Sequence, residues 1–93
     1  MSATWSTHAN RATNAPFSVY NGTPLPANLL GTTLVNQEQA PGDFTASGVG
    51  WRDLRTTGGA DVFTITGGTL TVRLTDNANE YVIADAIRIE RLL

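Results

Sequence analysis

The single histidine is the residue of this sequence best suited to acid–base chemistry at neutral pH. His8 follows Ser6 and Thr7, so a base and two hydroxyl groups stand close together in the chain. A catalytic triad also needs an orienting carboxylate and a framed nucleophile, and no nucleophile elbow or related motif surrounds any serine here. The sequence therefore predicts a protein that is not an enzyme, with no catalytic residue.

Asp85 is the carboxylate whose sequence surroundings stand out, because Ala84 and Ala86 flank it within an apolar segment. That position predicts a buried side chain, and a buried carboxylate must be paired or must accept several hydrogen bonds. Asp85 could serve as a catalytic acid, or it could be held by an arginine or by loop amides. We favour the structural role, and we expect Asp85→Ala to lose the fold.

Closely spaced oxygen ligands of the kind that calcium uses follow the most regular strand pattern. They are Asp76, Asn77, Asn79 and Glu80. Their spacing lacks the alternating ligands, central glycine and distant glutamate of an EF-hand loop. Asn and Asp also favour turns by bonding to their own backbone, so we interpret this cluster as a turn. The sequence therefore predicts no cofactor, with calcium at these four residues as the alternative.

Four aromatic side chains combine a flat apolar face with a polar group and could stack on sugar rings. A small domain also needs such rings in its core, and we expect Trp51 and Tyr81 to be core or corner residues, with Tyr81 in a structural role. Tyr20 precedes a turn and is expected at the surface. The candidate ligand-binding residues are therefore Tyr20, Trp5, Trp51 and Asn21.

Length and composition restrict both the architecture and the partners. A chain of 93 residues forms one domain over residues 1–93. A net charge of −2 without a basic cluster predicts no nucleic-acid partner. Cysteine is absent, so disulfides and thiolate metal sites are excluded. No apolar run is long enough for a membrane span, and the start MSATWSTHANRA has no signal-peptide core.

The elements that position these residues are expected to be strands. Residues 69–75 alternate strictly between polar and apolar, and with 62–66 and the Gly67-Gly68 pair they predict a tight hairpin. Residues 81–92 could form a helix, but the β-branched residues and the alternation around Ile87 and Ile89 favour a strand.

Four further strands are expected at 3–7, 17–20, 30–37 and 51–55, with a long loop at 39–50. About seven short strands, with turns every 8 to 12 residues or so, are typical of a sandwich. The predicted fold is all-β, an antiparallel, jelly-roll-like β-sandwich.

The run from Asp76 to Arg88, with its polar turn and Tyr-Val-Ile-Ala-Asp-Ala-Ile-Arg sequence, resembles the end of the golvesin or xanthan-lyase C-terminal-like domain, a β-sandwich module. Three other stretches agree: 3–5, 17–20, and 35–37 with Trp51 and Leu54. The chain departs from that family by an insertion at 57–62. The stretch 3–5 also resembles a strand well inside the family domain, which indicates a fragment or a domain shortened at its N-terminus.

The resemblance implies a non-catalytic binding or adhesion module of secreted or cell-surface proteins, with a polysaccharide as its partner. The alternative hypothesis is a structural protein that assembles with other copies of itself. Missing first strands would leave an open sheet edge, which a neighbouring chain could complete to give a dimer or a filament.

Overall fold

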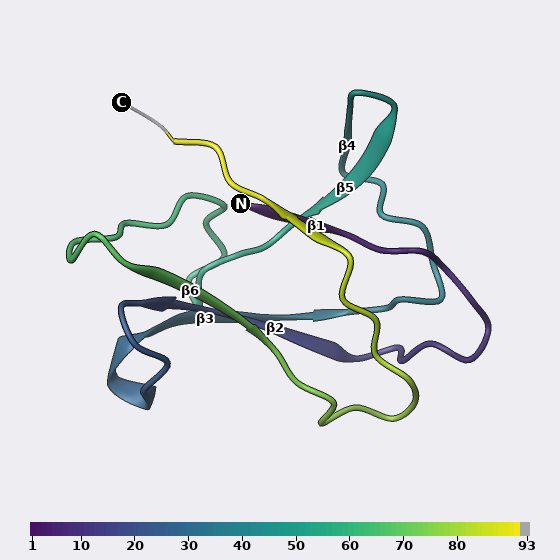
Figure 1. Ribbon diagram of the computed structural model, residues 1–93, viewed down its shortest axis with the longest axis horizontal. Helices are drawn as coiled ribbons and strands as arrows, with labels where there is room; N and C mark the ends of the chain where they lie inside the picture. Colours follow the sequence, from purple (N-terminus) through teal and green to yellow (C-terminus); the bar gives the residue numbers. More distant parts are fainter. Residues whose placement is uncertain (92–93) are drawn as a thin grey trace.

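The computed structural model describes residues 1–91, which form seven strands in two antiparallel sheets. One sheet has the order β4-β5-β1-β7 and the other β3-β2-β6, and the sheets lie as two layers in Figure 1. The bounds are β1 Ser2–Thr4, β2 Ala15–Asn21, β3 Leu29–Val35, β4 Phe44–Ala46, β5 Val49–Asp53, β6 Leu70–Leu74 and β7 Ala86–Arg88, with one 3-10 turn, η1, at Pro26–Asn28. The predicted all-β sandwich is confirmed.

The three-stranded sheet is built on the alternation of its central strand. In β2, Ala15, Phe17 and Val19 are buried toward the other sheet. The inward residues of β6 pair with this row, since Leu74 lies opposite Phe17 and Val72 opposite Val19. Successive side chains of a strand point to opposite faces, so one row of each strand reaches the core.

The core between the sheets is small and made of short side chains around a few large ones. Its buried members are Ala3, Trp5, Ala12, Ala15, Phe17, Val19, Val35 and Leu54. Trp5 satisfies its indole N–H by donating to the carbonyl oxygen of Gln39 at 2.9 Å. Ten half-buried apolar residues surround this cluster, which shows that a chain of this size leaves much of its apolar surface only partly covered.

One side of the sandwich is closed by the chain itself. After β5, residues 54–57 run along the outer edge of β3, where the Thr57 N–H donates to the Leu30 carbonyl at 2.9 Å. The Arg55 N–H donates to the Thr33 hydroxyl at 2.9 Å. Gly31 allows this approach, because a Cβ at that position would overlap the carbonyl oxygen of Arg55.

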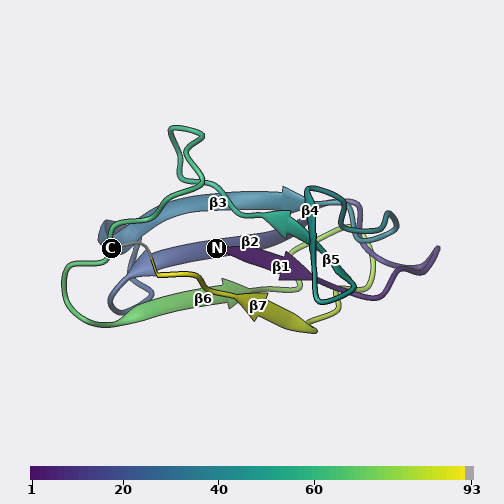
Figure 2. The same cartoon turned by 90° about the horizontal axis from the view of Figure 1, so that it is seen from above.

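The opposite side is open. Figure 2 shows β6 and β7 along the same side of the molecule, and in the described chain each of them pairs with only one strand. A slot of about 310 Å³ lies between them, lined by Phe17, Val72, Leu74, Ala84, Asp85, Ala86 and Ile87. Phe17 belongs to the buried core, so the slot reaches the interior.

The expected strand over 81–92 is confirmed only at Ala86–Arg88, and residues 81–91 contain no helix. A buried side chain replaces a neighbouring strand at Ile83. The Gln37 Nε2 donates to the Ile83 carbonyl at 2.9 Å, and the Ile83 N–H donates to Gln37 Oε1 at 3.0 Å. Leu92, the end of the predicted strand, lies outside the described residues.

The predicted hairpin of 62–66 with 69–75 is wrong, although its second strand is present as β6. Only Gly68 of the glycine pair has a positive φ, whereas type I′ turns need both central residues there and type II′ turns need the first. Residues 62–66 instead cross between the sheets, and the Asn21 amide binds the Thr66 backbone N–H and hydroxyl.

The predicted long loop at 39–50 contains a hairpin that the sequence analysis missed. Ser47 and Gly48 both have positive φ, at 53° and 77°, and they join β4 to β5 in register. This is the geometry of a two-residue type I′ turn. Figure 1 shows the hairpin projecting beyond the sandwich.

The described residues include no helix with the length and apolar character needed to cross a bilayer.

Candidate functional site

The β4–β5 hairpin places two aromatic rings on the outer face of the four-stranded sheet. Phe44 and Trp51 lie directly opposite each other, so their side chains share one face. Leu54 follows β5 directly and is buried in the core, and the alternation of the strand puts Arg52 on the same inward side. Trp51 and Asp53 therefore lie on the outward side. Both rings are half-buried.

Charged side chains of β5 and β7 lie on the same outer face, because both strands pair with β1. Ser2 is the register partner of both Asp53 and Arg88, so these three residues lie on the same side of the sheet. The Arg88 guanidinium carbon stands 5.5 Å from the centre of the Phe44 ring, within cation–π range. Arg88 Nη1 also lies 3.4 Å from a carboxylate oxygen of Glu90.

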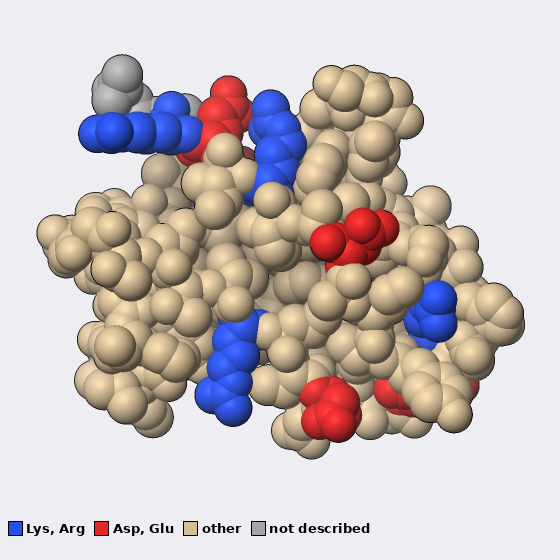
Figure 3. All heavy atoms as spheres, in the orientation of Figure 1, with Lys and Arg blue, Asp and Glu red and all other residues tan. Residues whose placement is uncertain are grey.

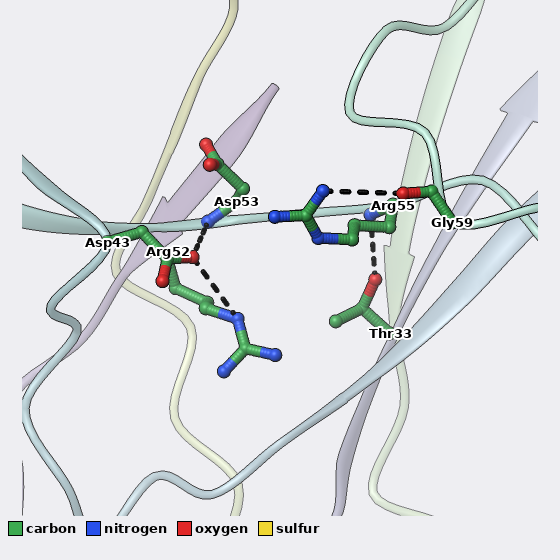
Figure 4. A network of polar contacts seen from close by, with 6 residues as sticks. All are labelled: Thr33, Asp43, Arg52, Asp53, Arg55 and Gly59. Carbon is green, nitrogen blue, oxygen red and sulfur yellow. Dashed lines mark hydrogen bonds and ion pairs between the residues drawn. The ribbon is translucent and has the colours of Figure 1, made fainter.

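Asp43 fixes the base of the hairpin, as Figure 4 shows. Its Oδ2 accepts the Asp53 backbone N–H at 2.8 Å and lies 3.4 Å from Arg52 Nε. The Asp43 N–H donates in turn to the Trp51 carbonyl at 2.9 Å. Because the Asp43–Arg52 pair is about 40% exposed, with side-chain values of 38% and 41%, its contribution to stability is small. These contacts join the residue before β4 to the backbone of β5.

A groove of about 830 Å³ begins at this face. Its walls come from the outer face of the four-stranded sheet, from residues 61–65, from Gly68 and Leu70 at the start of β6 in the other sheet, and from the last described residues. The lining residues are Met1, Ser2, Phe44, Asp53, Asp61, Val62, Phe63, Thr64, Ile65, Gly68, Leu70, Arg88, Ile89, Glu90 and Arg91. In Figure 3, charged side chains of both signs gather over the C-terminal end of the chain, and most of the rest of the face in view is uncharged.

The arrangement suits recognition of a polyhydroxylated molecule. Phe44 and the apolar lining supply flat surface, while Asp53 and Glu90 accept hydrogen bonds and Arg88 donates them. The Trp51 indole N–H is a buried donor that has no acceptor in the described structure, and Trp51 is not among the residues that line the groove. The groove is lined by three carboxylates, Asp53, Asp61 and Glu90, and by two guanidinium groups, Arg88 and Arg91. Charges of both signs nearly offset each other, so no strong preference for a charged ligand follows from electrostatics.

The aromatic side chains proposed as ligand contacts lie in different environments. Tyr20 is only 8% exposed, so its expected surface position is wrong; as a residue of the central strand, it is covered by neighbours that include Leu29 and Thr71. Trp5 is 6% exposed and belongs to the core. Asn21 uses its amide to hold Thr66.

Tyr81 was expected to be a core or corner residue, and its side chain is instead 68% exposed. Its backbone is well anchored, because its carbonyl accepts the Ala12 N–H at 2.6 Å and its N–H donates to the Asn10 carbonyl at 3.2 Å. These bonds fix the main chain and leave the ring pointing away from the core. Tyr81 is not among the residues that line the groove.

The two titratable residues considered for catalysis lie apart from the groove. Asp85 is exposed at the mouth of the slot between β6 and β7, so its predicted burial is wrong. The main chain leaves the strand pattern between Ile83 and Ala86, which turns the Asp85 side chain to the surface. His8 lies on an exposed turn, where its Nδ1 accepts the Asn10 N–H at 3.1 Å.

The polar cluster at Asp76, Asn77, Asn79 and Glu80 forms a turn bonded to the loop before β2. Asn79 Oδ1 accepts the Thr13 N–H at 3.1 Å, Asn79 Nδ2 donates to the Thr13 hydroxyl at 2.7 Å, and the Asn79 N–H donates to Asn14 Oδ1 at 3.0 Å. Within residues 1–91, no three His, Cys, Asp or Glu side chains gather in a way that could hold a metal ion. The Asn79 amide is therefore engaged in joining two loops.

Sequence reasoning missed Phe44 and Arg88 as site residues. The sequence predicts a loop at Phe44 and points to Arg88 only within the golvesin-like pattern. A local signal existed for Phe44, since Ser47-Gly48 lies between Phe44–Ala46 and the alternating residues of β5. No local signal predicts the contact between Arg88 and Phe44, because they are 44 positions apart (88 − 44). They come together only because β5 and β7 both pair with β1.

Comparison with known proteins returned no matching family model, no matching curated protein and no matching solved structure. The similarity to the golvesin-like domain thus stays a prediction from the sequence.

Proposed function

We propose that this domain is a non-catalytic binding module that holds a polysaccharide in the groove on the outer face of the four-stranded sheet. The observation that carries the proposal is the Phe44 ring under the Arg88 guanidinium, beside Asp53, in a groove of about 830 Å³. Sugar rings present apolar C–H faces and hydroxyl groups together. A ring, a donor and an acceptor in one groove match both features.

The shape of the groove supports an extended ligand. Its walls include three separate segments of the chain, near Phe44, Phe63 and Arg91, so a linear chain of several sugar units could contact all of them. The resemblance to modules of secreted proteins adds an extracellular or cell-surface setting, and that setting is part of the proposal.

Mobility in native gels that contain a soluble polysaccharide tests the proposal. The probes are hydroxyethylcellulose, a galactomannan and xanthan, which differ in linkage and in charge. We expect at least one of them to retard the protein. Phe44→Ala and Arg88→Ala should abolish the retardation, and Arg88→Lys should weaken it because an ammonium group lacks the planar donors of guanidinium.

Tyr81→Ala is the matched control, because Tyr81 is an exposed aromatic residue outside the groove. Its mobility should equal that of the parent protein, and circular dichroism should show that all variants keep their fold. The proposal is wrong if no probe retards the protein, or if Tyr81→Ala removes binding while Phe44→Ala preserves it.

A further inference from the structure

The outer edge of β6 has no partner in the described chain, and its free backbone groups can be identified. The Gly22 N–H donates to the Thr69 carbonyl at 2.9 Å, so Thr69 faces β2. Because bonded pairs alternate along an antiparallel ladder, Thr71 and Arg73 also face β2. The N–H and C=O groups of Leu70, Val72 and Leu74 therefore point away from the sheet.

This edge lacks several of the features that normally prevent strand pairing, and Arg73 is the one charged residue of β6. The β2–β6 register runs without a shift, so β6 has no bulge, and its sequence contains neither proline nor lysine. The edge of β3, by contrast, is shielded by residues 54–57. Exposed flat edges of this kind are templates for another strand.

Apolar side chains beside the edge are also incompletely covered. Leu70, Val72 and Leu74 face the core but are only half-buried, whereas Phe17 and Val19 of the neighbouring strand are 4% and 1% exposed. The slot of about 310 Å³ between β6 and β7 continues this apolar surface to the core. A strand added at β6 would cover the rim of that slot.

We propose that the edge of β6 binds the β6 edge of a second copy of this chain, antiparallel and about a two-fold axis at Val72. The sequence Leu-Thr-Val-Arg-Leu is palindromic in polarity, so this register places Leu70 opposite Leu74 of the other copy and Val72 opposite Val72. Apolar residues then continue the inner face of both sheets. The outward groups of these residues are the ones that a hydrogen-bonded antiparallel pair uses.

The position of the one charge in β6 is compatible with a second copy as the occupant. In this register Thr71 lies opposite Arg73 of the other copy, so the only charged residue of the strand never faces its own equivalent. The interface uses the same surface from both copies, and it closes on itself as a dimer with one continuous sheet of six strands.

Amide hydrogen exchange at several protein concentrations tests the pairing directly. We expect protection of the Leu70, Val72 and Leu74 amides to rise with concentration, while the Thr71 and Arg73 amides are protected throughout by β2. Sedimentation equilibrium over roughly 1 µM to 1 mM should show a monomer–dimer equilibrium, since modest interfaces dissociate in this span.

Two matched substitutions test the register. Thr71→Glu and Thr71→Arg both lose the bond from the Thr71 hydroxyl to the Gly22 carbonyl, which measures 2.7 Å. The first places a carboxylate opposite Arg73 of the other copy at two symmetric positions, and the second places a guanidinium there. Opposite charges across strands attract and like charges repel, so dimerisation should be about tenfold tighter with Glu than with Thr and about tenfold weaker with Arg.

The combined variant Thr71→Arg with Arg73→Glu should restore dimerisation, and high salt should reduce all of these differences. A monomer at every concentration would overturn the proposal. Slow exchange of the Val72 amide in a monomer would also overturn it, because residues 62–66 of the same chain would then occupy the edge of β6. Fibres would exclude the closed pairing at Val72. A dimer whose affinity changes with none of these charge substitutions would exclude it as well. None of these results depends on polysaccharide binding, so the two proposals fail separately.

Discussion

Replacing Gln37 with methionine tests how the last third of the chain is attached to the sandwich. Gln37 is 0% exposed, and its amide forms two hydrogen bonds with the backbone of Ile83, at 2.9 and 3.0 Å. Methionine has a similar length and fills a similar volume, so the change removes the polar group with little loss of packing. What remains is a backbone N–H and a backbone C=O without their partner.

The expected loss follows from those two groups. A buried polar group that loses its partner costs about 1–3 kcal/mol, and Ile83 is half-buried, so water will satisfy part of the deficit. We expect Gln37→Met to lower the free energy of unfolding by about 3 kcal/mol. For a domain of this size that is a large share of a total of roughly 5–14 kcal/mol, and it corresponds to a fall in Tm of about 12–24 °C.

Urea unfolding followed by circular dichroism measures this change. Gln39→Met is the control, because Gln39 is exposed and only its backbone is used: its carbonyl accepts from Trp5 and its N–H donates to the Asn36 carbonyl. The control should stay within about 0.5 kcal/mol of the parent protein. A Gln37→Met loss no larger than that of the control would refute the view that Gln37 holds Ile83.

Gln37→Glu adds a signature in pH. An ionised carboxylate can accept the Ile83 N–H but cannot donate to the Ile83 carbonyl, and burial raises the pKa of the introduced carboxyl above its unfolded value. The folded protein then binds more protons than the unfolded chain between these two pKa values, so stability falls as pH rises through that window. Relative to the parent protein, this variant should be least stable at neutral pH and should recover part of the loss as the pH falls toward 4.

Three further changes have expected outcomes. Gly31→Ala should prevent folding or cost more than about 2 kcal/mol, because the new methyl group meets the Arg55 carbonyl, whereas Gly67→Ala, with open space around it, should change stability little in urea unfolding. Asp85→Ala should keep the fold and change the free energy of unfolding by less than about 0.5 kcal/mol, since this carboxylate is exposed. If this variant fails to fold, Asp85 has the structural role that the sequence predicts. Asn79→Ala should lower stability by about 1–2 kcal/mol through its lost bonds to Thr13, and millimolar calcium should leave the Tm of the parent protein unchanged in a thermal melt.

The candidate site was only partly accessible from the sequence. Trp51 is predicted from its type to contact a ligand, and it lies opposite Phe44, which lines the groove, without lining the groove itself. Tyr20 and Trp5 have the same chemical character but are buried, because they occupy a central strand and the core. The type of a side chain states what it could bind, whereas its exposure depends on the strands that flank it.

The sequence by itself determined the fold class and most of the strand-forming segments. Alternation of polar and apolar residues is a local property, so β2, β3, β5 and β6 could be located from it. The tertiary structure alone decided which segments pair. Residues 62–66 have a strand pattern but cross between the sheets, and Ile83 is held by the Gln37 side chain in place of a neighbouring strand. Alternation specifies the face on which a side chain lies but not the partner strand or its register, and contacts such as Arg88 with Phe44 exist only once distant strands have been aligned.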